Sequence, residues 1–131
     1  MRRASRRDVE RRLAQTPERY VMGADRVREF AEVSRVVDLV SYQDGAIVSR
    51  IVVKRETGNV TLFAFDAGQE LSEHTAPYDA LVQILDGEAT ITVAGRPSRV
   101  RAGEMILMPA HQPHALKAIA PFKMLLTMIR S

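Results

Sequence analysis

Two stretches of the sequence decide how the chain folds: GQELSEHTAPYDALVQILDG at residues 68–87 and GEMILMPAHQPHALKA at residues 103–118. Both are runs of branched and apolar residues that begin or end at a glycine, where a turn can take a positive φ without steric cost. Together they hold all three histidines of the chain, His74, His111 and His114. The two stretches therefore indicate β-strands with imidazole side chains gathered near their ends.

The rest of the chain after residue 35 repeats this pattern. Short runs rich in valine, isoleucine, leucine, threonine and phenylalanine are broken by turn residues about every ten positions, which is typical of an all-β protein. The predicted strands are 36–42, 46–54, 60–66, 70–75, 79–86, 88–94, 98–101, 104–108, 113–119 and 122–129. So many short strands are expected to close into a barrel or a two-sheet jelly roll, because closure leaves few exposed edges.

Length and composition favour one globular domain that stays in solution. The 131 residues are 46% hydrophobic and 27% charged, and no run approaches the ~20 apolar residues of a membrane-spanning helix. We therefore expect no membrane association. The chain has no cysteine, which excludes disulfides and thiolate ligands and fits a reducing cytoplasm. A metal ion would need nitrogen and oxygen ligands.

Basic residues gather at the N-terminal end. Residues 1–19 hold seven arginines against three acidic residues, a net charge of +4, whereas the whole chain carries +3. The remainder is thus nearly neutral. Clustered arginines can bind nucleic acid, but no aromatic residue precedes Tyr20 to stack on bases, so we do not expect nucleic-acid binding.

The chain divides into an arm and a barrel. We predict a basic N-terminal arm over residues 1–35 and a β-barrel domain over residues 36–131. Short helices are expected between residues 8 and 36, because Thr16-Pro17 and Asp25 have the residue types that cap helix starts.

The first of the two stretches resembles the first motif of the cupin superfamily, in particular of its small single-domain members. That motif places a His-x-His pair and a glutamate between two glycines, and Gly68, His74 and Gly87 match it in spacing. The resemblance implies a cupin fold, a double-stranded β-helix or jelly-roll barrel.

The second stretch resembles the second cupin motif, which runs from a glycine through Pro-x-Gly to a histidine and an asparagine. Gly103, Pro109 and His114 match it in spacing. The similarity covers about residues 60–129, with a hairpin between the two motifs as in the family. Two motifs at this separation are specific for the fold.

The chain departs from the family where the family binds its metal. Four positions differ: Ala76 in place of the second histidine, Ala80 in place of the glutamate, His111 in place of a glycine and Ala118 in place of the asparagine. The resemblance therefore leaves His74 and His114 as ligands, one fewer than a usual catalytic metal site requires. His111 could supply a third ligand, whereas Asp79 is expected to face the other side of its strand. Binding of a divalent nickel, manganese, iron or zinc ion thus remains an open alternative.

The same positions predict a pocket whether or not a metal is bound. His74, Ala76, Ala80, Val82 and His114 would place two imidazoles beside small and branched apolar groups. Two functions remain open. The first is binding of an unidentified small molecule, as in a sensor or carrier. The second is metal-dependent catalysis of the dioxygenase, isomerase or decarboxylase kind that the superfamily contains, and the fold does not name the reaction.

The last predicted strand, 122–129, is apolar on both of its faces. A barrel interior can cover only one face, so we expect a homodimer that buries the outer face against a second copy. Small cupins, which this chain resembles, often pair in this way. The alternative is that residues 8–35 fold back over the strand within one chain.

Overall fold

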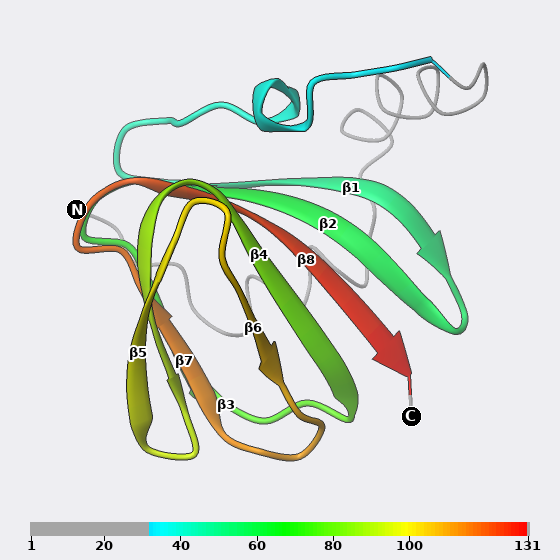
Figure 1. Cartoon of the computed structure of the whole chain (residues 1–131), viewed down its shortest axis with the longest axis vertical. Coiled ribbons are helices and arrows are strands. Elements are labelled where there is room, and N and C mark those ends of the chain that lie inside the picture. Colours follow the sequence, from blue (N-terminus) through cyan, green and yellow to red (C-terminus); the bar gives the residue numbers. More distant parts are fainter. Residues whose placement is uncertain (1–31, 131) are drawn as a thin grey trace.

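Eight strands dominate residues 32–130, the part of the chain described by this computed structural model (Figure 1). The strands are β1 (Ile47–Arg55), β2 (Gly58–Phe65), β3 (Glu70–His74), β4 (Tyr78–Val93), β5 (Arg96–Arg101), β6 (Met105–Met108), β7 (His114–Lys117) and β8 (Phe122–Arg130). All pairings are antiparallel in the order β1-β2-β8-β4-β7-β3, and β5 and β6 also pair with β4. Figure 1 shows the sheet curled around one interior. The expected all-β jelly-roll fold is confirmed.

Strand β4 belongs to both halves of the curled sheet. Its first part pairs with β6 and β8, and its second part, from Glu88 onward, pairs with β5 and β7. The change of partners falls where the register shifts between Ile84 and Asp86 and where Gly87 takes a φ of +73°. A glycine is needed there because other residues rarely adopt a positive φ. This corner lets one strand join the two halves.

The core lies between the two halves of the sheet. Buried residues alternate with more exposed ones along β4 and β8, as strand geometry requires, whereas the second half of β2 is buried on both faces. At the closed end the rings of Phe65 and Phe122 stack with centroids 4.5 Å apart, and Phe63 lies 6.1 Å from Phe65. Burial of each such ring contributes roughly 1.5–3 kcal/mol.

A second apolar cluster covers part of the outer face of β2 and β8. It contains buried Val40, Leu62 and Ala64, with Leu39 and Leu125 partly buried against them. The segment around Val40 is held in place by Lys123 Nζ, which donates a 2.8 Å hydrogen bond to the carbonyl oxygen of Val37, and by Tyr42, whose hydroxyl donates to Asp86. Part of the outer face is therefore covered within one chain.

Two details of the predicted strands were wrong. Residues 36–42 form no strand: Val36–Leu39 is a short 3-10 helix, η1, and the apolar residues that follow pack onto the outside of the sheet. The separate strands predicted at 79–86 and 88–94 are one long strand, because Gly87 bends β4 without ending it.

Within the described residues, η1 is the only helical element, and none of their helices is long and apolar enough to cross a membrane. Most of the predicted arm, including the helix caps at Thr16 and Asp25, lies outside these residues.

Candidate functional site

His74 and His114 come together at one end of the barrel. β3 ends at His74 and β7 begins at His114, and the two residues lie opposite each other in register. Their rings meet edge to face with centroids 4.3 Å apart, and the two Nε2 atoms are 3.1 Å apart. Neighbouring strands thus bring together residues that are forty positions apart in the sequence.

The other nitrogen of each ring fixes its tautomer. His74 Nδ1 lies 2.8 Å from the carbonyl oxygen of Ser72, and His114 Nδ1 lies 3.1 Å from that of Gln112. A carbonyl oxygen only accepts, so each Nδ1 carries the hydrogen and donates it. In the neutral rings both Nε2 atoms therefore present lone pairs.

Two lone pairs that face each other across 3.1 Å repel, unless a hydrogen-bond donor or a cation lies against them. A direct hydrogen bond between the rings needs a second proton on one of them. Burial, and next the charge of His74, lower the pKa of His114 below its usual value, which the hydrogen bond to Gln112 only partly offsets. His114 thus favours its neutral form, in which Nε2 accepts.

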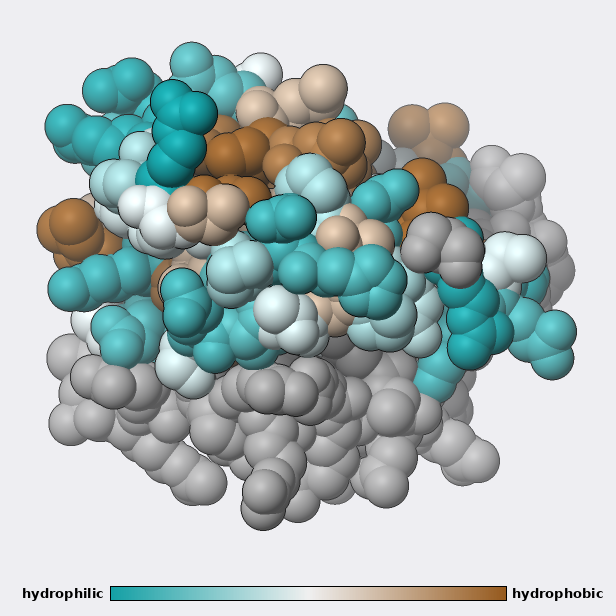
Figure 2. Space-filling model, turned by 90° about the horizontal axis from the view of Figure 1, so that it is seen from below, coloured by the Kyte–Doolittle hydropathy of each residue, from teal (hydrophilic) through white to brown (hydrophobic). Residues whose placement is uncertain are grey.

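The pair faces a cavity of about 390 Å³. Its wall is mostly apolar: Phe63, Leu71, Ala76, Ala80, Met108, Leu116, Met124, Leu126 and Met128. The β1–β2 hairpin contributes Lys54, Arg55 and Glu56, and the β3–β4 connection contributes Thr75 and Pro77. Figure 2 looks onto the end of the molecule where these connections lie and shows hydrophobic side chains bordered by hydrophilic ones. The cavity can hold a small molecule with a largely apolar body.

Four of the five predicted pocket residues line this cavity: His74, Ala76, Ala80 and His114. Val82 does not. It follows Ala80 on the same face of β4 but lies one step deeper, where it is fully buried in the core. Alternation along the strand indicates the face that a residue occupies, but not its depth.

His111 does not join the other two histidines. It is exposed, takes a φ of +66° in the turn before β7, and uses its backbone N–H to bond the carbonyl oxygen of Ala76 at 2.8 Å. That position is a glycine in the motif that the chain resembles, which agrees with the positive φ. Among residues 32–130, no three histidine or carboxylate side chains lie close enough together to hold a metal ion. Asp79 instead accepts a 2.9 Å hydrogen bond from the backbone N–H of Ala110.

The sequence did not indicate the part of the site that comes from the β1–β2 hairpin. Lys54, Arg55 and Asn59 line the cavity although they are distant in sequence from both motifs. The only sequence signal there is a turn at Gly58, which says nothing about where the hairpin tip packs. Methionines such as Met124 and Met128 likewise look the same in sequence whether they fill a core or line a cavity.

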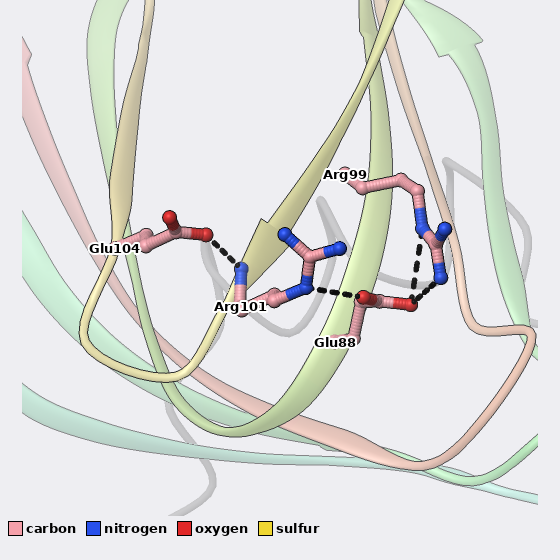
Figure 3. Close-up of polar contacts among 4 residues, drawn as sticks. All are labelled: Glu88, Arg99, Arg101 and Glu104. Atoms are coloured by element: carbon pink, nitrogen blue, oxygen red, sulfur yellow. Dashed lines mark hydrogen bonds and ion pairs between the residues drawn. The ribbon is translucent and has the colours of Figure 1, made fainter.

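A second polar cluster lies on the β4–β5 hairpin and its neighbouring turn (Figure 3). Glu88 accepts from Arg99 at 2.7 Å and pairs with Arg101 at 3.0 Å, and Glu104 accepts from the backbone N–H of Arg101. The hydrogen bond from Arg99 is the largest cause that lowers the pKa of Glu88. Arg99 and Arg101 are exposed, Glu88 is half-buried and none of them lines the cavity, so the cluster links β4 to β5 away from the candidate site.

Comparisons with known proteins agree with this geometry. A family model described as cupin domain matches residues 61–129, which include both histidines. The chain is 40% identical to a conserved protein of unknown function from Streptococcus pyogenes, with a TM-score of 0.74, over 77% of this chain and 89% of that one. It is 41% identical to a cupin 2 conserved barrel domain protein from Leptotrichia buccalis, with a TM-score of 0.70, over 72% of this chain and 46% of that one. A cupin superfamily protein from Desulfitobacterium hafniense shares 27% identity, with a TM-score of 0.71, over 73% and 88%. Among curated proteins, none matches the chain.

Proposed function

The chain belongs to the cupin family, and we propose that it binds a small molecule in the cavity beside His74 and His114. One observation carries the proposal: two buried or half-buried imidazoles, with their Nε2 atoms 3.1 Å apart, line a mostly apolar cavity. Such acceptors are costly to leave without a partner, so they are best explained by a ligand that contacts them. We also propose a cytoplasmic location, which the cysteine-free sequence favours.

A metal-dependent enzyme of the dioxygenase, isomerase or decarboxylase type is the second candidate. It is favoured by the Nδ1 contacts of His74 and His114, because histidines that bind metals usually donate their other N–H to a carbonyl or carboxylate oxygen. A divalent nickel, manganese, iron or zinc ion could bind between the two Nε2 atoms. However, Ala76 and Ala80 add no donor atoms to the cavity wall, and two protein ligands are fewer than a catalytic metal site uses. The donor set therefore does not complete such a site.

The metal content of the protein separates the two candidates. Elemental analysis of the full chain, purified without an affinity tag and dialysed, should find well below one equivalent of any transition metal, because two imidazoles hold an ion weakly. The matched control is the same preparation incubated with excess nickel and dialysed again, which should lose the added metal. Retention of about one equivalent would replace the small-molecule proposal with the metal-dependent enzyme.

We further propose that the chain is a homodimer that pairs through the outer face of β6, β4 and β8. Met105, Leu107 and Ile129 are 65%, 52% and 56% exposed there, and the register places Leu107 beside Leu81 of β4. Exposed apolar side chains on one face of a folded chain favour association. The cluster around Leu125 on the same sheet is already covered within one chain, so the interface is expected nearer β6.

Light scattering after size-exclusion chromatography tests the dimer. The chain should elute with twice its mass at micromolar concentration, and Leu107→Asp should convert it to the mass of one chain, because a carboxylate would be buried in the interface. Ile119→Asp, at an exposed position between β7 and β8, is the control and should leave the mass unchanged. One chain mass for the unsubstituted protein at these concentrations would disprove the dimer.

A further inference from the structure

Two groups of polar residues of different character line the mostly apolar cavity: the histidine pair, and Lys54, Arg55 and Glu56 of the β1–β2 hairpin. We propose that its ligand is a small hydroxy acid, in which an apolar body separates a hydroxyl group at the histidine pair from a carboxylate at the β1–β2 hairpin. This inference rests on the proposed small-molecule function. It adds the chemical class of the ligand and its orientation.

The part of the cavity beside His74 and His114 favours a ligand group that donates a hydrogen bond. With Nδ1 of His74 and of His114 each donating to a backbone carbonyl, the two neutral rings offer only accepting Nε2 atoms to the cavity. A carboxylate also only accepts, so it would add a third acceptor at this end. A hydroxyl donates one hydrogen and relieves the repulsion between the two lone pairs. An alcohol therefore fits this end better than an anion.

The hairpin end favours an anion. Lys54 and Arg55 line the cavity from the end of β1, and Glu56 is the only carboxylate among the lining residues. Arg55 Nη1 donates a 2.8 Å hydrogen bond to the carbonyl oxygen of Lys54, which fixes the guanidinium at the hairpin while its other N–H groups can still donate. Two cations against one carboxylate give this end a net positive charge.

The wall between the two ends restricts the body of the ligand. Phe63, Met108, Met124, Leu126 and Met128 belong to it, and all five side chains are apolar. Methionine side chains are flexible and adapt to an unbranched chain. A volume of about 390 Å³ lies near the lower end of the range of small-molecule sites. A short aliphatic body thus suits the cavity.

Three matched probes test the class of the ligand: 8-hydroxyoctanoate, octanoate, which lacks the hydroxyl, and 1-octanol, which lacks the carboxylate. Isothermal titration calorimetry with the full chain should rank 8-hydroxyoctanoate first, and loss of either polar group should weaken binding by about tenfold. Six-carbon and ten-carbon versions of the same set would find the length that spans the two ends.

Variants assign each polar group to its end of the cavity. His114→Phe should remove the advantage of 8-hydroxyoctanoate over octanoate, and His74→Leu is the second variant should the first fail to fold. Arg55→Gln should reduce the advantage of 8-hydroxyoctanoate over 1-octanol. Arg99→Gln, the same charge change outside the cavity, is the control and should alter neither comparison.

The outcomes separate this inference from the function on which it rests. If 1-octanol binds as tightly as 8-hydroxyoctanoate, or if Arg55→Gln leaves their difference intact, the hydroxy-acid class is wrong while the cavity remains a binding site. If none of the probes of any length binds at millimolar concentration, both the class and the proposed small-molecule function lose their support.

Discussion

Replacement of Gly87 by alanine should destabilise the fold by roughly 3 kcal/mol or more, since a clash adds to an unfavourable backbone conformation. A Cβ atom at this position would lie 2.1 Å from the carbonyl oxygen of Pro121, which is backbone and cannot rotate away. The φ of Gly87 is +73°, which alanine rarely adopts. Because β4 changes partners at this corner, a shift there would disturb both halves of the sheet.

Urea unfolding, monitored by circular dichroism, measures this decrease in the free energy of unfolding. Gly95→Ala is the matched control, because Gly95 has a similar φ of +79° but no atom within 4 Å of the position of a Cβ. The control should lose only the conformational part, about 1–2 kcal/mol. If Gly87→Ala and Gly95→Ala lose the same free energy of unfolding, Gly87 is not in close contact with the backbone near Pro121.

Much of the fold could be predicted from the sequence, because the turns and the alternation of apolar residues are local signals. The strand predicted at 36–42 failed for a physical reason. Val40 does become buried and Leu39 partly so, but they pack against the outside of β2 and β8 without joining a ladder. Alternation indicates that a face will be covered, but not which surface covers it.

The candidate site, like the fold, could be predicted only in part from the sequence. His74 and His114 could be singled out because each falls in a motif with defined spacing, and the structure brings them to one cavity. The role of His111 could not be read in this way, because its orientation depends on the positive φ of its turn. The hairpin cations Lys54 and Arg55 could not be found either, since their position depends on how β1 and β2 curl toward the histidine pair.

The small cavity residues Ala76 and Ala80 allow the most direct test of the site as a whole. Both line the cavity near the histidine pair, and they stand where the cupin motif that the chain resembles has a histidine and a glutamate. Ala76→His combined with Ala80→Glu would therefore offer four donors in place of two. Loss of a residue that only hydrogen-bonds to a metal ligand lowers metal affinity by about 10–100-fold. Two added ligands, which would touch the ion directly, should therefore raise metal affinity by about 100-fold or more.

Calorimetric titration of the double variant with nickel or manganese is the measurement that tests this site most directly. The control is Thr92→Glu with Ala115→His, which places the same two groups opposite each other in register but away from the cavity lining. The double variant should bind about 100-fold or more tighter than the unsubstituted chain, and the control should gain far less. Equal affinity in the double variant and the unsubstituted chain would contradict the cupin geometry at positions 76 and 80, and with it the assignment of His74 and His114 to a ligand site.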